Sequence, residues 1–533
     1  MNLEDFQIEL MPLPGAMPVW HGRADAAQWR TVCQQVRGEG GRLVALWSSD
    51  GNDRGEGYAV HAALAVRSGL IVATLALAGE SFPDVSDIFP SAGRMQRAVC
   101  DLFGVQAEGA ADQRKWLRHA AWRADEFPLR KDFIHEPRAT NHESRVTSHE
   151  SPITNHQSRP EQMDSYPFVL VEGEGVHEIP VGPVHAGTIE PGHFRFSIVG
   201  EGVLRLEERL GYKHKGIEKR FEQMTLAEGA RLAGRVSGDS TVAYAWAYAM
   251  AVEAVTGITP PPRASWLRAL LLERERVGQH LWDLGFLGND AGFAFGLAQF
   301  SRLREDSLRA SHLLFGHRYL MDAIVPGGVS RDIDTAGIAG IRREIDALRT
   351  TVATLREIYV NHAGLQDRFV DCGRIRQDQA ARLGLTGLAG RASGIASDLR
   401  VQIPPAPYDR LGVRIAVRSG GDVAARATVR VDEIEESLRL IGAILDGMPG
   451  GGIAVPVPAA PENAFGIGWV EGWRGEVLIA LETGANNRIR RLHPHDPSWQ
   501  NWPLLERAVL GNIVPDFPLI NKSFNLSYSG QDL

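Results

Sequence analysis

Three cysteines, Cys33, Cys100 and Cys372, are the only thiols among the 533 residues, and they lie far apart in the sequence. An odd number of widely separated cysteines rules out a disulfide framework and indicates a reducing compartment. Three thiolates also cannot build a four-cysteine metal site. Cys100 lies among apolar residues, so we expect it to be a small buried hydrophobe.

Histidines recur every seven residues at His142, His149 and His156, within a segment, 134–165, that is nearly devoid of apolar residues. A histidine-rich tract can bind metal ions. The segment is also a tandem repeat with too little apolar surface to fold, and its one apolar residue per heptad is too few for a coiled coil. We interpret it as a disordered linker that divides the chain into 1–133 and 166–533.

Ser237, Asp239 and Ser240 stand close together in the sequence RVSGDS and could suggest a serine nucleophile. Hydrolases of the α/β type place such a serine in a G-x-S-x-G turn with a matched histidine base. The sequence around Ser237 has neither feature, so we expect no hydrolase activity. No GxGxxG or P-loop pattern predicts a nucleotide site.

The composition is that of a globular protein, with 44% apolar and 23% charged residues and a net charge of −8. A mildly acidic chain has no electrostatic footprint for a nucleic-acid backbone, so we expect no nucleic-acid partner. The acidic start argues against a secretory signal. No stretch reaches the roughly 20 uninterrupted apolar residues of a membrane span. Any membrane association should therefore come through partners.

Sequence patterns predict an α+β protein with a small α+β domain at 1–133 and a mostly helical domain with a small β-sheet at 166–533. In the first domain we expect helices at 26–37 and 92–103 and strands within 41–48 and 58–77. In the second we expect strands at 168–171, 193–199, 203–208, 411–429 and 465–489, and helices at 226–255, 264–287, 293–320, 338–362 and 431–445.

Several segments in the same order resemble two known subunits. The sequences FPDVSDIFPSAGRMQRAVCDLFGV (82–105) and FPLRKDF (127–133) resemble the 30-kilodalton-type subunit of respiratory complex I. The second domain resembles the large subunit of group 4 nickel–iron hydrogenases, the formate hydrogenlyase and hydrogenase-4 type, which is homologous to the 49-kilodalton-type subunit of complex I. The segments that carry this likeness are GPVHAGTIEPGHFRF (182–196), ERLGYKHKGIEKRFE (208–222), PGGV (326–329), LTGLAGRASG (385–394), PYDRL (407–411) and VEGWRGE (470–476).

In nickel–iron hydrogenases four cysteine thiolates hold the metals, and the resemblance puts these ligand positions at Ser237, Ser240, Ser527 and Gly530. A serine hydroxyl is protonated near neutral pH and is a poor ligand for a soft metal, while glycine has no side chain. We therefore expect no nickel–iron site, and no cofactor bound by this chain.

Complex I implies a quinone held by a histidine and a tyrosine. The histidine position is Ile189, with His193 four residues further on, and the tyrosine position is Gly238, with Tyr244 as the nearest aromatic alternative. The pattern for quinone reduction is therefore not met residue by residue. His193 and Tyr244 stay candidates for a quinone bound in another way.

The resemblance implies roles for four further residues. Glu218 matches a glutamate associated with proton transfer near the metal, although it could pair with a neighbouring lysine instead. Arg391 matches an arginine beside the metal pocket and could pair with Asp239, Glu218 or a partner subunit. Asp290 matches an acidic position that could relay protons if buried, although an ordinary surface acid is equally expected there. His185 lies in a loop suited to a place near a partner's iron–sulfur cluster.

The resemblance thus implies a peripheral-arm large subunit of a membrane-bound hydrogenase-4-like or complex I-like oxidoreductase that couples electron transfer to proton or cation translocation, without a nickel site. Its expected partners are a small subunit with a 4Fe–4S cluster, a ferredoxin-like subunit and antiporter-like membrane subunits. The expected place is the inner face of the cytoplasmic membrane. The alternatives are an inactive coupling subunit and a quinone-site subunit of the NADH–quinone oxidoreductase type.

Overall fold

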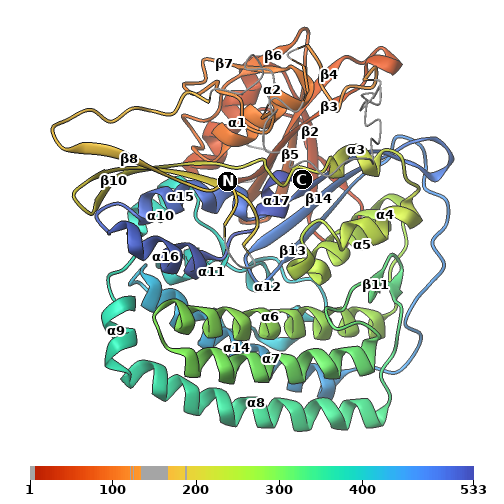
Figure 1. The fold of residues 1–533 in the computed structure, drawn as a ribbon. Helices are drawn as coiled ribbons and strands as arrows, with labels where there is room; N and C mark the ends of the chain where they lie inside the picture. Colours follow the sequence, from red (N-terminus) through yellow and green to blue (C-terminus); the bar gives the residue numbers. More distant parts are fainter. Residues whose placement is uncertain (1–5, 120–121, 124, 134–165, 186–188) are drawn as a thin grey trace, which may run out of the picture.

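The computed structural model describes residues 6–119, 122–123, 125–133, 166–185 and 189–533, and it confirms the predicted α+β fold (Figure 1). The first part forms a five-stranded sheet in the order β1-β2-β5-β4-β3, in which only β2 and β5 run parallel. Its elements are β1 (Met11–Leu13), β2 (Val19–Ala24), α1 (Ala26–Gly38), β3 (Arg42–Asp50), β4 (Tyr58–Val66), β5 (Gly69–Ala76), β6 (Ser81–Pro83), α2 (Ala92–Phe103) and β7 (Gln106–Glu108).

Helix α1 shows why the periodic segments fold as predicted. Asp25 caps its first turn by accepting the N–H groups of Ala27 and Gln28, which would otherwise lack partners. Its buried residues, Trp29, Val32, Cys33 and Val36, follow the helical spacing and form one apolar face. Cys33 is thus a core residue. Cys100 is only half-buried, so the expectation of full burial there is wrong.

The second part combines two three-stranded antiparallel sheets with a helical layer. The sheets follow the orders β10-β9-β8 and β13-β14-β15. Their strands are β8 (Val176–Val181), β9 (His193–Val199), β10 (Gly202–Arg209), β13 (Phe465–Glu471), β14 (Glu476–Thr483) and β15 (Ile489–His495). The other elements are α3 (Ile217–Phe221), α4 (Leu226–Ala233), α5 (Thr241–Thr256), β11 (Ile324–Val325), β12 (Gly328–Val329), α9 (Ala363–Phe369), α10 (Gln377–Leu383), α11 (Gly387–Ala392), α12 (Leu399–Gln402), α13 (Tyr408–Leu411), α15 (Ser498–Ala508), α16 (Phe517–Phe524) and α17 (Tyr528–Asp532).

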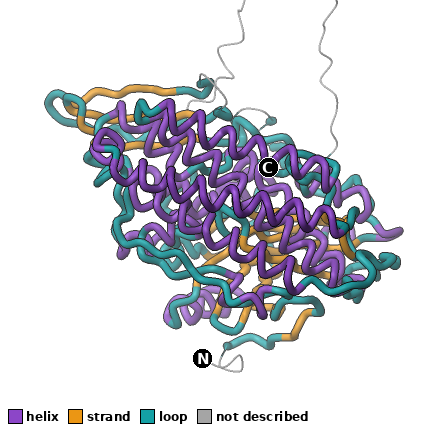
Figure 2. Tube along the Cα trace, turned by 90° about the horizontal axis from the view of Figure 1, so that it is seen from below, coloured by secondary structure: helices purple, strands orange, loops and turns teal. Residues whose placement is uncertain are grey.

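Four long helices form the layer at the bottom of Figure 1: α6 (Pro262–Asp290), α7 (Ala294–Phe315), α8 (Thr335–Asn361) and α14 (Val423–Gly447). Figure 2 shows helices lying side by side across this face, with the strands behind them. Helix α6 begins with Pro262 at its first position, where a proline needs no hydrogen-bond donor. No helix in the described ranges is long and apolar enough to cross a membrane.

Three predicted elements differ from the structure. The helix expected at 226–255 is broken at residues 234–240, where Gly234 ends α4 and the chain turns before α5. Residues 168–171 form no strand, and the strand-like stretch 411–429 is an unpaired loop that runs into α14, whose first turn Asp422 caps. A segment with strand propensity forms a strand only where a neighbouring strand can pair with it. Residues 412–422 have no such neighbour among the described residues, and the cap at Asp422 begins a helix instead.

The two parts share one apolar core, and Trp47 of β3 stacks on His493 of β15 with ring centroids 5.3 Å apart. The predicted linker, 134–165, with its repeated histidines, lies outside the described residues. The boundaries at 133 and 166 therefore stay a prediction.

Helix α5 lies directly on β13 at Gly468. A Cβ at this position would come within 2.6 Å of the Ala247 carbonyl carbon. We expect Gly468→Ala to lower the free energy of unfolding by about 1–3 kcal/mol through overpacking, measured by denaturant unfolding. Gly278→Ala in α6 is the control, because nothing lies within 4 Å of its Cβ; an equal loss in both variants would contradict the close contact.

Candidate functional site

The two segments that carry the four ligand positions meet in space. Ser237, before α5, and Ser527, before α17, are 290 positions apart in the sequence, yet their Oγ atoms lie 2.8 Å apart. The Ser527 hydroxyl also accepts the Gly530 N–H at 2.9 Å and so caps α17. The convergence that the resemblance implies is therefore present in the fold.

The Arg474 guanidinium joins these segments. It forms an ion pair with Asp239, with one Nη 3.1 Å from Oδ1, and donates to Ser240 Oγ at 3.1 Å. Its Nε donates to the Asn525 carbonyl at 2.5 Å. Arg474 is 5% exposed. A buried cation thus links the two ligand segments, where a hydrogenase has metal ions.

The position of Arg474 is fixed by the turn between β13 and β14. Arg276 of α6 donates to the backbone carbonyls of Glu471 and Gly472 at 2.8 and 3.1 Å. The neighbouring Trp473 donates its indole N–H to the Asp239 carbonyl at 2.8 Å. The long helix α6 therefore holds the turn that presents Arg474 to Asp239.

Charge at the site is set by burial and by Arg474. Burial opposes ionisation of Asp239, but the Arg474 guanidinium and the Ser237 hydroxyl outweigh it and lower the pKa of Asp239. Asp496, just after β15, accepts the Tyr244 hydroxyl at 2.9 Å. Burial raises the pKa of Asp496 despite the nearby Arg474. The site thus combines a carboxylate whose pKa is lowered, Asp239, with a buried carboxyl whose pKa is raised, Asp496.

The carboxyl group of Asp496 fills the space beside the fourth ligand position, Gly530. A Cβ added at Gly530 would lie 2.6 Å from Asp496 Cγ, so no cysteine side chain fits there while Asp496 keeps its place. The hydroxyls of Ser237, Ser240 and Ser527 are all engaged in hydrogen bonds. In the described part of the chain, no three or more His, Cys, Asp or Glu side chains gather to hold a metal ion. These residues do not fit a nickel–iron centre.

A cavity of about 510 Å³ opens beside the ligand positions. The quinone candidates do not line it. Tyr244 is fully buried in α5 with its hydroxyl on Asp496. His193 lies in β9 with Nδ1 3.3 Å from the Gly182 carbonyl, and His185 lies with Nε2 2.8 Å from the Gly192 carbonyl. The structure does not bring these three side chains together around the cavity.

Glu218 lies between the two parts of the chain. It is 4% exposed and contacts Arg491 at 2.7 Å and His493 Nδ1 at 2.8 Å. Burial would raise its pKa, but Arg491 and His493 lower it to about 2. Glu218 is therefore a fixed carboxylate, and it does not line the cavity.

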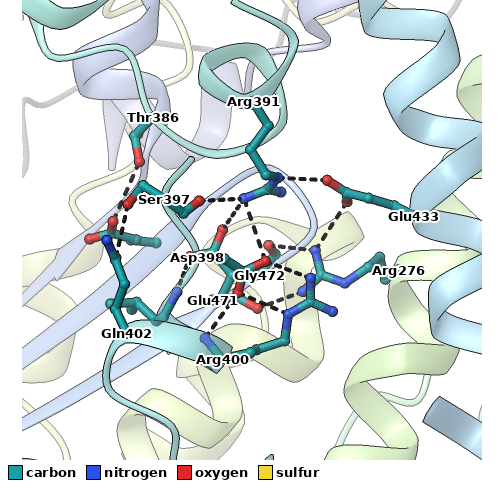
Figure 3. Close-up of polar contacts among 12 residues, drawn as sticks. Arg276, Thr386, Arg391, Ser397, Asp398, Arg400, Gln402, Glu433, Glu471 and Gly472 are labelled. Carbon is teal, nitrogen blue, oxygen red and sulfur yellow. Dashed lines mark hydrogen bonds and ion pairs between the residues drawn. The ribbon is translucent and has the colours of Figure 1, made fainter. Parts of the chain in front are cut away.

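Arg391 belongs to a separate buried cluster (Figure 3). Its guanidinium contacts Glu433 at 2.7 Å and Glu471 at 2.8 Å, and it is fully buried. It pairs with neither Asp239 nor Glu218. Burial, with the charge of Asp398, raises the pKa of Glu471 to about 7. Since Glu471 and Arg474 flank one turn, this cluster and the ligand positions are held by the same segment.

Asp290 ends α6 and is partly buried, which raises its pKa. Three residues of the site, Arg474, Asp496 and Glu275, were not predicted from the sequence. Arg474 stands within the family-like segment VEGWRGE, which could have pointed to it. No sequence signal marks Asp496 or Glu275, because their neighbours at the site come from distant segments.

Glu275 of α6 is the buried carboxyl nearest the start of α5. It accepts the N–H groups of Val242 at 2.7 Å and Ala243 at 3.3 Å. Burial raises its pKa to about 8, and the charge of Asp239 contributes to the rise. A buried carboxyl with a pKa of about 8 that interacts with Asp239 in the cavity wall is a candidate proton carrier.

Glu275 should make stability depend on pH. Because its pKa in the folded state, about 8, exceeds its ordinary 4.5, the folded protein holds a proton that the unfolded chain has lost, and this stabilisation disappears as the pH rises toward 8. Relative to Glu275→Gln, the wild type should lose about 1.4 kcal/mol per pH unit between pH 5.5 and 7.5, measured by denaturant unfolding. The exposed Glu357→Gln is the control; a constant difference between Glu275→Gln and wild type would contradict the assignment.

Comparison with known proteins identifies the family of this chain. Residues 23–139 match the family model described as respiratory-chain NADH dehydrogenase, 30 Kd subunit, and residues 290–463 match the 49 Kd subunit model. The chain is 31% identical to formate hydrogenlyase subunit 5 of Escherichia coli, over 93% of this chain and 85% of that protein. It is 32% identical to hydrogenase-4 component G of the same organism, over 92% and 84%.

A solved structure shows the same fold. It is a chain of the membrane-bound sulfane sulfur reductase, an archaeal respiratory membrane complex, with a TM-score of 0.64 and 26% identity. The match covers 67% of this chain and 99% of that one. The chain therefore belongs to the family of group 4 hydrogenase-type large subunits in which complex I 30- and 49-kilodalton-type modules are fused, as in formate hydrogenlyase subunit 5 and hydrogenase-4 component G.

Proposed function

We propose that this chain is the large subunit of a membrane-bound oxidoreductase complex of the hydrogenase-4 and complex I type, and that it works there without a nickel–iron centre. The observation that carries the proposal is the Arg474–Asp239 ion pair, which lies across the ligand segments of a family whose members are named hydrogenases and hydrogenlyases. The fold of the large subunit is kept, while the metal position is filled with protein.

Partners follow from the same relatives. We propose that the chain docks a small subunit with a 4Fe–4S cluster and a ferredoxin-like subunit, and that antiporter-like subunits hold the complex on the inner face of the cytoplasmic membrane. The similar proteins that support this are a subunit of an NADH dehydrogenase, a hydrogenase component and a chain of a membrane-bound respiratory complex. In such an assembly the chain would help couple electron transfer to proton or cation movement.

Buried carboxyl groups of this chain would bind and release protons near the cavity. Glu275 and Asp496 are buried carboxyls with raised pKa values, and each lies within electrostatic reach of the Asp239–Arg474 pair. The ion pair keeps Asp239 ionised, whereas burial raises the pKa of Glu275 to about 8 and raises that of Asp496 above its ordinary value. Glu275 would exchange protons with the site through its neighbour Asp239, which lines the cavity.

A coupling subunit without chemistry of its own is the second candidate. It is favoured by the burial of Tyr244, which contacts Asp496 and does not reach the cavity. Electron transfer from the reduced complex to added quinone separates the two candidates. A redox subunit gives quinone-dependent turnover, and a coupling subunit gives none.

Metal analysis of the intact purified complex tests the central claim. Serine and glycine replace the four thiolates, and Arg474 lies between the two segments that carry these positions. We therefore expect a nickel content far below one atom per chain. Iron in the same sample is the internal control, since it shows that the partner's clusters survived purification. Stoichiometric nickel would overturn the proposal.

Substitution at the fourth ligand position tests whether protein fills it. A Cβ at Gly530 would lie 2.6 Å from Asp496 Cγ, so Gly530→Ala should lower the free energy of unfolding by about 1–3 kcal/mol. Gly450→Ala, with nothing within 4 Å, should change it little.

A double-mutant cycle with Asp496→Ala sharpens this test. If the two side chains compete for one space, Gly530→Ala should cost less when Asp496 is already alanine. Strictly additive losses in denaturant unfolding would show that Asp496 does not occupy the ligand position.

A further inference from the structure

Two cationic side chains that line the cavity beside the ligand positions form no ion pair with any described residue. Arg304 of α7 and Lys522 of α16 both line it, together with Gln279 and Trp282 of α6. Among the described residues, no carboxylate oxygen lies within 4.0 Å of either cation. Arg474 in the same wall is paired, which makes Arg304 and Lys522 the exceptions.

Arg304 is held in a fixed place by aromatic rings. Its guanidinium carbon lies 4.2 Å from the Trp282 ring centroid and 5.6 Å from that of Tyr319. Its Nε is buried and has no hydrogen-bond acceptor in the described part of the chain. The Tyr319 side chain hydrogen-bonds to the guanidinium. A buried donor without an acceptor is costly, so the Nε–H is the one donor of this side chain left buried and unpaired among the described residues.

Lys522 is positioned in the same manner. Its Nζ lies 5.1 Å from the ring of Phe286, which packs on Trp282 with centroids 4.2 Å apart. Two cations therefore flank one aromatic pair, and cation–π contacts hold them without neutralising their charge. Lys522 forms no ion pair with Asp290 but lies near enough to offset part of the rise that burial causes in the pKa of Asp290.

The acidic side chains of the cavity wall do not cancel these charges. Asp239 is paired with Arg474. Glu190 accepts the Ser529 N–H at 3.0 Å and its hydroxyl at 2.6 Å, and it lies 3.4 Å from Lys213. The lining therefore carries three cations, Arg304, Arg474 and Lys522, against two carboxylates, and Gln279 adds a polar side chain to the wall.

We propose that this cavity binds a small anion, an oxyanion or a carboxylate, through Arg304 and Lys522. A guanidinium and an ammonium are the donors that such groups prefer. The volume of about 510 Å³ suits a small molecule. The inference rests on the proposed function, because it names the class of ligand that binds beside the position where the relatives' ligand residues converge.

Calorimetric titration of the purified full-length chain with sodium sulfate, at constant ionic strength in chloride, tests this site. We expect one saturable sulfate per chain. Arg304→Gln and Lys522→Gln should each weaken binding about tenfold, as expected for the loss of one charge-assisted hydrogen bond. Arg302→Gln is the matched control, because this arginine lies on the same helix, is exposed and pairs with Asp306; it should bind sulfate as the wild type does.

Absence of saturable binding to the wild type, or wild-type sulfate affinity in both cavity variants, would overturn the proposal. Thermal unfolding of each variant checks folding, and Arg304→Lys, which keeps the charge, should retain most of the affinity if Arg304→Gln folds poorly. Binding to the free chain but not to the intact complex would show that an acidic group of a partner occupies the cavity, which also contradicts a small ligand. Nickel content is a separate measurement, so failure here leaves the proposed function standing or falling independently.

Discussion

The ion pair between Arg474 and Asp239 is the contact on which the architecture of the site depends. In metal-containing relatives, ligands to a shared metal would tie the two ends of the domain together. Here the Arg474 guanidinium does so, since it reaches Asp239, Ser240 and the Asn525 carbonyl at once. A buried guanidinium must have its donors satisfied, because an uncompensated charge in the interior costs several kcal/mol. The positions of the acceptors around Arg474 are therefore tightly constrained, as the ligands of a metal ion would be.

This requirement extends into the helical layer through α6. Arg276 binds the carbonyls of the β13–β14 turn, Arg268 pairs with Glu253, and Glu273 pairs with Arg400. Each of these charges is buried and each has a partner, so removing one partner would strand the other. Such a network adds little net stability over an apolar core, but it specifies one register of the elements. The turn that carries Glu471 and Arg474 is held from both sides by this network.

Local patterns predicted the elements that bury an apolar face. The helices α1, α2, α6, α7 and α8 appear within a few residues of the predicted bounds because helical spacing and caps act over one or two turns. The errors at 234–240 and 411–429 have a different origin. Whether a β-branched stretch pairs as a strand, or a helix is interrupted, depends on neighbours that lie far away in the sequence. The edge strand β8, which contains Pro180, was missed for the same reason.

The sequence by itself determined which chemistry the site lacks. With Ser237, Ser240, Ser527 and Gly530 at the ligand positions, the thiolates are absent whatever the fold. Only the tertiary structure decided what stands in their place. Arg474 and Asp496 reach the site from two other segments. The rings that contact Arg304, which has no ion-pair partner among the described residues, come from α6 and from a loop after α7. The sequence alone gives the type of each side chain. Which charges form ion pairs, and which side chain occupies a given space, depend on distances between residues that can be hundreds of positions apart.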